Sequence, residues 1–197
     1  MTHIKTLKSD MSILELELIK TNIIMNVDSI RQYNIDKIIS FFKNNNELST
    51  LEKYKIADEI YEASQKYEEL SVELICATIT QESGPGWKTN QVSSAGALGL
   101  MQIMPITGML TANYADITWT NSRDILLNPI LNVRIGTRYL ATLVNTYGIE
   151  GGLAAYNGGE TRAKLWLAQG KQDGILFRET QNYVPSVMGL YHEYRED

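Results

Sequence analysis

A single glutamate in an apolar setting is the first group in this sequence that could do acid–base chemistry. Glu82 ends the apolar run that begins at Leu74, and the sequence from Ser83 to Ala115 holds no aspartate or glutamate and one basic residue, Lys88. A carboxyl group among apolar neighbours and without a counter-charge has a raised pKa. Such a group can donate a proton near neutral pH, which is the task of a general acid. The alternative is a glutamate at a helix end whose side chain faces solvent.

A glycine-punctuated apolar stretch follows Glu82 and carries one amide. The residues from Gly96 to Pro105 read GALGLMQIMP. Glycine allows a backbone to approach a ligand closely, and Gln102 offers both a donor and an acceptor to sugar hydroxyl or acetamido groups. The alternative is the core of a strand or helix that includes one glutamine.

Two later stretches add hydroxyl, amide and carboxyl groups. Tyr156 and Asn157 lie in the run AYNGG at 155–159, although an Asn-Gly pair is also an ordinary helix end. Glu179 and Tyr183 are four residues apart in the run ETQNYV, so they share one helix face. Each stretch is a weak signal alone, and the order of all of them along the chain is the stronger one.

The pattern of apolar residues predicts mainly helices around these stretches. We expect a helix from Ser49 or Thr50 to about Tyr67, a helix from 71 to 82 that ends at Gly84-Pro85-Gly86, and a further helix that begins near Pro105. Later helices are expected over 128–147, near 151–169 and near 179–194. Residues 84–104 are expected to be irregular loop with short strands. The fold class is therefore mainly α, with a loop-rich insertion directly after Glu82.

The beginning of the sequence is expected to form a helical extension over residues 1–46, distinct from a domain over 47–197. The run Asn44-Asn45-Asn46 is the clearest break in the chain. Before it, apolar residues at helical spacing predict one helix over 12–33 and a second over 35–43.

This extension could be a packed helical hairpin or a docking element for a protein partner. Leu16, Ile19 and Ile23 belong to a wide and regular apolar face that also includes Ile13. Because such a face gains free energy when it is covered, we expect it to pack on the domain.

Composition excludes several classes of protein. Cys76 is the sole cysteine, so no internal disulfide can form. The two histidines, His3 and His192, lie near the two ends of the sequence and offer no arrangement for a zinc site or a Ser-His-Asp triad. We expect no metal and no other cofactor. The net charge of −5, without a basic stripe, argues against a nucleic-acid partner.

Residues 70–195 resemble the catalytic domain of soluble lytic murein transglycosylases, relatives of goose-type lysozyme. Four motifs in order carry the resemblance: QES at 81–83, GLMQIMP at 99–105, AYNGG at 155–159 and ETQNYV at 179–184. The resemblance implies an α+β lysozyme-like fold and Glu82 as the sole catalytic acid/base. The substrate-binding positions that it implies are Ser93, Gln102, Met104, Tyr156, Asn157, Glu179 and Tyr183.

The resemblance also implies a reaction on peptidoglycan. Glu82 would protonate the β-1,4 bond between N-acetylmuramic acid and N-acetylglucosamine, and would then take the proton of the muramic acid C6 hydroxyl as a 1,6-anhydro ring closes. Glycosidases with two carboxylates need a second acid across the ring, and Asp116, Asp124 or Glu179 could still fold close to Glu82. Two alternatives therefore stay open: a lysozyme (muramidase) that hydrolyses the same bond, and a non-catalytic wall-binding or virion component.

The early sequence bears on how such a protein would reach a cell wall. The first thirty residues alternate charged residues with Leu and Ile and lack the unbroken apolar core of a signal peptide. The most apolar early run, Ile19 to Val27, contains Lys20, so no membrane insertion is expected. We expect delivery by phage lysis, by a virion or by a secretion apparatus, and favour a phage endolysin.

Overall fold

The structure is a computed structural model that describes the backbone of residues 2–196 and the side chains of residue 11 and of residues 14–196. Over this range the regular elements are helical, and strand-like pairing is confined to isolated bridges of Leu98 with Val92 and with Ile103. The prediction of a mainly α fold is therefore confirmed. In chain order the elements are α1 (Thr2–Phe41), α2 (Thr50–Lys66), α3 (Val72–Ser83), α4 (Pro105–Ala112), η1 (Asn113–Ala115), α5 (Ser122–Leu126), α6 (Pro129–Gly158), α7 (Glu160–Ala168) and α8 (Arg178–Glu196).

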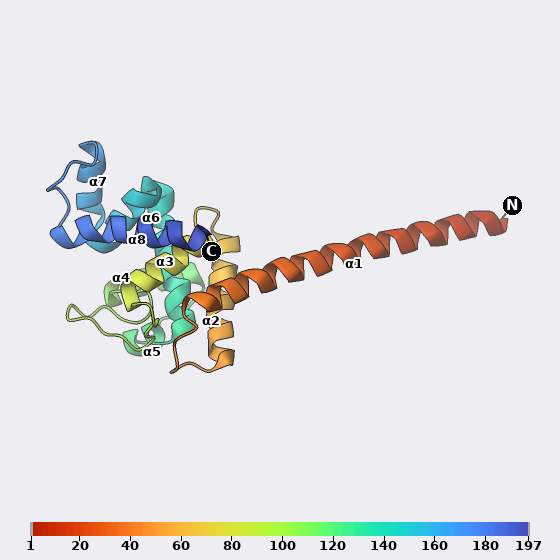
Figure 1. Cartoon of the computed structure of the whole chain (residues 1–197), viewed down its shortest axis with the longest axis horizontal. Coiled ribbons are helices and arrows are strands. Elements are labelled where there is room, and N and C mark those ends of the chain that lie inside the picture. The colour runs from red at the N-terminus through yellow and green to blue at the C-terminus, as the bar shows by residue number, and fades with distance from the viewer. Residues whose placement is uncertain (1, 197) are drawn as a thin grey trace.

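Helices α2 to α8, together with η1, form a compact body from which α1 projects (Figure 1). Helix α6 packs against α2, α7 and α8, and α3 packs against α8. Fully buried side chains from three elements meet in the core, among them Ile75 of α3, Leu140 of α6 and Val187 of α8. Because α3 lies against α8, the end of α3 that carries Glu82 faces the beginning of α8.

Side-chain caps fix where the main helices begin. Ser49 caps α2 and forms a capping box with Glu52, and Ser71 caps α3. Asn128 caps α6 ahead of a proline in the first turn. Such caps satisfy backbone N–H groups that have no partner inside the helix. The predicted starts of these three helices are confirmed.

Two glycines interrupt the long helical segment after Asn128. Helix α6 has a local break at Gly148, where φ is 71° and ψ is 174°, which agrees with the predicted end of a helix at Tyr147, and it then continues to Gly158. The helix expected near 151–169 is instead divided at Gly159, where φ is 84°. A positive φ interrupts a right-handed helix, and glycine adopts it without a steric penalty.

The predicted division of the extension into helices over 12–33 and 35–43 is wrong, because α1 runs through both ranges. The polar Asn34 between them does not end the helix. Its side-chain amide donates a hydrogen bond of 2.8 Å to the backbone oxygen of Ile30, one turn earlier. An asparagine that bonds within its own helix is tolerated in the helix interior.

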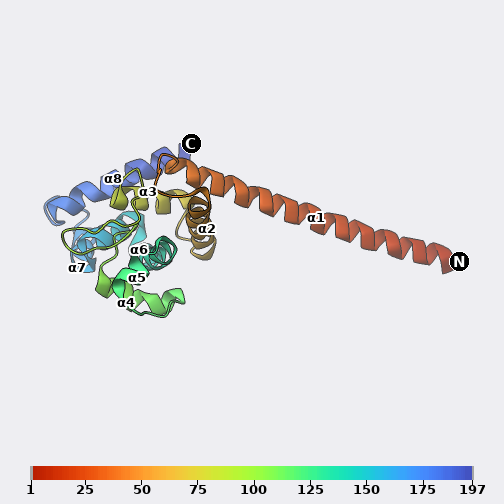
Figure 2. The ribbon, with the colours of Figure 1, turned by 90° about the horizontal axis from the view of Figure 1, so that it is seen from below.

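The prediction that the apolar face of the extension packs on the domain is also wrong. Leu16, Ile19 and Ile23 are 58%, 55% and 56% exposed, and α1 leads away from the body in both views (Figures 1 and 2). The side chain of Ile13 lies outside the described residues. Helical periodicity identifies an apolar face but does not say which surface covers it.

The last turns of α1 belong to the core of the body. Ile35, Ile38 and Phe42 are fully buried. Ion pairs fasten the same part of the helix: Arg31 pairs with Asp58 and Glu62, and Lys37 pairs with Glu73. A domain boundary near residue 46 stays a prediction, and the buried face begins well before that position.

Among the helices of residues 2–196, none is both long enough and apolar enough to cross a lipid bilayer.

Candidate active site

Glu82 and Tyr183 meet where α3 packs against α8. Glu82 lies in the last turn of α3, and Tyr183 lies in the second turn of α8. The hydroxyl group of Tyr183 donates a hydrogen bond of 2.6 Å to Oε1 of Glu82. Because Tyr183 is only 4% exposed, its ring has little freedom and holds the carboxyl group in one orientation.

Burial dominates the acidity of Glu82. The loss of solvation raises the pKa of Glu82 from 4.5 to about 7, because burial disfavours the charged carboxylate. The hydrogen bond from Tyr183 acts in the opposite direction, and the negative charge of Glu179 raises the pKa further. The direction agrees with the prediction from the apolar, acid-free sequence around Glu82. Near neutral pH this carboxyl group can both give up and accept a proton.

Tyr156 is the second tyrosine at this place. Its hydroxyl group donates a hydrogen bond of 2.7 Å to the backbone oxygen of Met101. Burial, and after it the charge of Glu82, raises the pKa of Tyr156 well above its usual value. The same two causes raise the pKa of Tyr183. Both tyrosines are therefore neutral hydroxyl groups beside the carboxyl group of Glu82.

The loop after α3 is tied back to Glu82 through two glutamines. The side-chain amide of Gln91 donates to the backbone oxygen of Glu82 at 3.2 Å. The side-chain amide of Gln102 donates to Gly99 at 2.7 Å and to the backbone of Gln91 at 3.4 Å. Gln102 has a φ of 45°, a conformation that costs energy in a non-glycine residue. The glycine-punctuated stretch therefore lies beside the end of α3.

The AYNGG run meets the start of α8. Thr180 donates a hydrogen bond of 2.7 Å to the side-chain oxygen of Asn157. A Cβ atom on Gly158 would lie 2.7 Å from the hydroxyl oxygen of Thr180, which only glycine avoids. Glu179 directly precedes Thr180, is exposed, and is close enough for its charge to affect Glu82. The third and fourth motifs are thus brought together.

Ser93 and Met104 lie in the same loop region but are not joined to the other predicted site residues. The hydroxyl oxygen of Ser93 accepts a hydrogen bond of 2.9 Å from the backbone of Ala97, which closes a turn in the loop. Met104 precedes α4 and is 40% exposed. Neither residue has a described contact with Glu82. The substrate-binding roles of these two and of the other predicted positions stay predictions.

Asn132, which the sequence did not single out, holds the loop in place from α6. This fully buried amide accepts a hydrogen bond from the backbone of Met101 and donates to the backbone oxygens of Leu98 and Leu126, each at 2.8 Å. A Cβ atom on Gly99 would lie 2.2 Å from the oxygen of Leu126, so the loop passes too close for any other residue. The only signal for Asn132 in the sequence was a polar residue on the inward face of a predicted helix. The sequence carried no signal for the contact of Gln91 with Glu82.

A second contact that the sequence did not predict joins the end of α1 to the loop that follows Glu82. The rings of Phe42 and Trp87 stack with centroids 4.3 Å apart, and Asn45 donates to the backbone of Gly86 at 2.7 Å. The indole N–H of Trp87 donates to the hydroxyl oxygen of Thr80 at 2.8 Å. Residues before the predicted domain boundary therefore support the segment beside the site.

The sequence left three acids open as a possible second carboxylate beside Glu82, and the structure distinguishes between them. Asp116 pairs with Lys66 at 3.6 Å, and Asp124 is held by the side chain of Asn121 at the start of α5. Of the three, Glu179 is the acid whose charge reaches Glu82.

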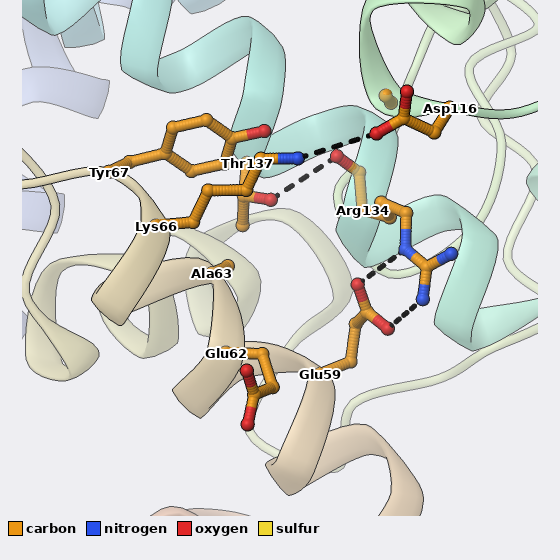
Figure 3. A pocket seen from close by; sticks show the side chains of 9 residues that line it. Glu59, Glu62, Ala63, Lys66, Tyr67, Asp116, Arg134 and Thr137 are labelled. Atoms are coloured by element: carbon orange, nitrogen blue, oxygen red, sulfur yellow. Dashed lines mark hydrogen bonds and ion pairs between the residues drawn. The ribbon is translucent and has the colours of Figure 1, made fainter.

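A pocket of about 310 Å³ lies elsewhere, between α2, η1 and α6 (Figure 3). Arg134 forms two hydrogen bonds with Glu59 across it, at 2.5 and 2.7 Å, and Lys66 faces Asp116. Its lining residues differ from those around Glu82. Because both bases are already paired with acids, the pocket gives no reason to place sugar chemistry there.

Comparison with known proteins agrees with this geometry. Residues 59–176 match the family described as the transglycosylase SLT domain. The soluble lytic murein transglycosylase of Escherichia coli K12 is 32% identical over 155 residues, which cover 73% of this chain and 24% of that protein. The match thus spans between about a quarter and a third of the length of the curated relatives.

Solved structures show the same fold. The 70 kDa soluble lytic transglycosylase of Escherichia coli aligns with a TM-score of 0.59 at 31% identity, over 74% of this chain and 26% of that one. The lytic transglycosylase Slt of Pseudomonas aeruginosa, solved as an inactive mutant, aligns with a TM-score of 0.60 at 26% identity, over 70% of this chain and 23% of that one. The lysozyme-like fold class expected from the motifs is therefore confirmed.

Proposed function

Because the chain belongs to the family of transglycosylase SLT domains, we propose that it cleaves the glycan strands of peptidoglycan as a lytic transglycosylase, with Glu82 as the acid/base. The names of the relatives supply the class of reaction. The observation that carries the proposal is the partly buried carboxyl group of Glu82, whose pKa of about 7 suits a proton donor.

The proposed reaction uses one carboxyl group twice. Glu82 gives its proton to the oxygen that links C1 of N-acetylmuramic acid to C4 of N-acetylglucosamine, and the bond from C1 to this oxygen breaks. The C6 hydroxyl oxygen of the muramic acid then bonds to C1. The proton of that hydroxyl group returns to the carboxylate of Glu82, so no water is consumed.

The residues around Glu82 support this scheme through position. Tyr183 fixes the carboxyl group by its hydrogen bond. Tyr156 ties the loop that follows α3 to α6, and Gln102 bonds within that loop. These two residues are our candidates for residues that orient the sugar. Orientation matters because the C6 hydroxyl group must react before water does, and preorganisation can supply several kcal/mol.

A muramidase is the second candidate, and the charge of Glu179 at Glu82 favours it. Glu179 is exposed at the start of α8, where a carboxylate could activate water. In such an enzyme the muramic acid would keep a reducing end. The two reactions differ in their products and not in the identity of the acid.

The product therefore tests the proposal. Purified sacculi are digested, reduced with borohydride and analysed by mass spectrometry. We expect muramic acid ends that are one water lighter than hydrolysed ends and that resist reduction. Predominantly reducible ends would identify a muramidase, and no product at all would leave the non-catalytic wall-binding component. The Glu82→Gln variant serves as the blank.

The biological setting of the proposed activity rests on sequence alone. Peptidoglycan is the proposed substrate, and neither a nucleic-acid partner nor a cofactor enters the scheme. Delivery to the wall by phage lysis, a virion or a secretion apparatus stays a prediction, as does the function of an endolysin.

A further inference from the structure

Arg138 on α6 is a cation whose guanidinium group contacts only aromatic rings among the described residues. The guanidinium carbon lies 5.8 Å from the ring centre of Tyr67 and 5.9 Å from that of Tyr114. Such contacts stabilise the charge, but they leave the N–H groups of the guanidinium without an oxygen acceptor. Arg134, one turn earlier on the same helix, instead donates two hydrogen bonds to Glu59. Of these two arginines, Arg138 is therefore the one that can receive an anion from outside the chain.

Arg138 lines a pocket of about 230 Å³ between α4, η1 and α6. The other residues that line this pocket, which we call the Arg138 pocket, are Leu110, Thr111, Tyr114, Tyr139 and Thr142. The arginine side chain is partly exposed there, and the lining holds no acid. Residues 105–115, which form α4 and η1, contain no charged residue, and Asp116 pairs with Lys66. The Arg138 pocket thus presents a positive charge that its own lining does not neutralise.

The Arg138 pocket adjoins the surroundings of Glu82 through Tyr139. The ring of Tyr139 lies 5.4 Å from the ring of Tyr156, measured between centroids. Tyr156 in turn lies close enough to Glu82 for the charge of that carboxylate to raise the pKa of Tyr156. A group in the Arg138 pocket can therefore belong to the same molecule that Glu82 acts on.

We propose that the Arg138 pocket binds a carboxylate group of the wall substrate, with Arg138 as the residue that recognises it. The proposal rests on the cleavage of peptidoglycan proposed above. Arginine binds a carboxylate through two parallel hydrogen bonds, which are stronger than bonds between neutral groups. Each muramic acid residue supplies a carboxyl group, in its lactyl group when it carries no peptide and in the peptide stem when it does. Leu110 and Tyr114 add apolar surface for the methyl group of the lactyl group or of an alanine.

The charge of the whole protein gives this cation a specific role. The net charge is −5, so the protein as a whole repels a glycan strand that carries carboxylates. A cation fixed beside the site offsets this repulsion locally. Arg138 therefore makes the site prefer a strand with free carboxylates over the same strand without them.

The experiment measures affinity by titration calorimetry with the Glu82→Gln chain, and mass spectrometry checks that the fragments stay intact. The probes are soluble fragments of four sugars that carry peptide stems, and the same fragments after an amidase has removed the stems. Each probe is also prepared with its carboxyl groups converted into neutral methylamides. We expect the methylamides to bind at least about tenfold more weakly than the acids for one of the two probes.

The substitution Arg138→Gln in this chain should remove that difference, because it lowers the affinity for the acid and leaves the affinity for the methylamide unchanged. A purely structural role of Arg138 would lower both affinities equally. Arg195→Gln is the matched control, because it removes another arginine from a tyrosine ring, at the end of α8. It should leave the difference between acid and methylamide intact.

The probe that shows the difference identifies the source of the carboxylate: the stem-bearing fragments point to the peptide, and the bare fragments point to the lactyl group. Equal affinities for acid and methylamide, or a difference that survives Arg138→Gln, overturn the proposal. Circular dichroism and melting check the fold. If Arg138→Gln does not fold, Arg138→Lys carries the test, and it should reduce the difference at least about threefold because lysine lacks the two-pronged geometry.

Failure of this inference is distinct from failure of the proposed function. If the wild type cleaves walls and no preference for carboxylates is found, only the role of Arg138 is wrong. If walls are not cleaved but the preference depends on Arg138, the carboxylate site stands and the assigned reaction is wrong.

Discussion

The hydroxyl group of Tyr183 reaches Oε1 of Glu82 at 2.6 Å across 101 residues of sequence. The bond opposes the effect of burial, because it stabilises the charged carboxylate that burial disfavours. The acidity of Glu82 is therefore a balance between the packing of α3 on α8 and one donor from α8. That balance can be shifted by single substitutions.

We expect Tyr183→Phe to raise the pKa of Glu82 above its present value of about 7. The proposed reaction begins with protonated Glu82, so activity falls as pH rises through this pKa. The alkaline limb of the pH–rate profile should therefore move to higher pH, by on the order of one unit. The maximal rate should also fall, because the carboxyl group loses its orientation.

Tyr191→Phe is the matched control, because it removes a hydroxyl group from the same helix at a partly exposed position that contacts His192. Its pH–rate profile should match that of the wild type. An alkaline limb that stays in place in Tyr183→Phe would contradict the assigned role of the hydrogen bond.

We expect Glu82→Gln to lower the rate of wall cleavage by at least about a hundredfold. The amide has nearly the volume of the acid but cannot give up and retake a proton. Turbidity of a suspension of purified walls measures the rate. Glu68→Gln makes the same change at an exposed position and should leave it unaltered. More than a tenth of wild-type activity in Glu82→Gln would exclude Glu82 as the acid.

Glu82 should also make the stability of the protein depend on pH. Its pKa is raised from 4.5 to about 7 on folding, so the folded state holds a proton that the unfolded chain releases. The contribution of Glu82 to the free energy of unfolding is fully present below pH 4.5. It is lost as pH rises through 7, and it amounts to at most roughly 3 kcal/mol. The melting temperature of Glu82→Gln should lack this part of the pH dependence. If the melting temperatures of the wild type and of Glu82→Gln changed equally between pH 4 and pH 8, Glu82 would not be a protonated, partly buried group in the folded state.

We expect Asn132→Ala to destabilise the fold by on the order of 3 kcal/mol, because it removes a hydrogen bond from each of three backbone groups. The oxygen of Leu98 keeps its bond from the backbone of Ile103, so the loss falls mainly on Met101 and Leu126. Asn145→Ala, at an exposed position of the same helix, should change stability by less than about 0.5 kcal/mol. Urea unfolding of both variants measures the difference. Equal midpoints would mean that the loop does not depend on Asn132.

The structure moves the expected limit for shortening the extension. A chain that begins at Ser29 keeps the buried Ile35, Ile38 and Phe42, so we expect it to fold and to remain active. A chain that begins at Glu47 loses all three, and we expect aggregation or a much lower melting temperature. A stable chain from Glu47 would show that the end of α1 is dispensable for the core.

The sequence predicted best what depends on neighbouring residues. The caps at Ser49, Ser71 and Asn128 follow from local chemistry, and so does the apolar surrounding that raises the pKa of Glu82. The mainly α fold class followed from the helical spacing of apolar residues, which is also a local property of the sequence.

Contacts between distant residues could not be predicted in the same way. Asn132 meets the backbone of Met101 across 31 residues, and a single amide in a helix carries no sign of such a contact. The exposure of Leu16 was missed for a related reason. An apolar stripe on a helix requires a covering surface, but its own residues do not tell whether that surface belongs to the same chain.

The stacked rings of Phe42 and Trp87 connect the end of α1 rigidly to the body. A flexible linker would not transmit to the body a force that acts on the far end of α1. A rigid helix transmits such a force, because rotation of α1 about its own axis would displace Phe42 relative to Trp87. Trp87 in turn is bonded to Thr80, two residues before Glu82. A force on the projecting part of α1 would therefore act first on the loop beside the carboxyl group of Glu82.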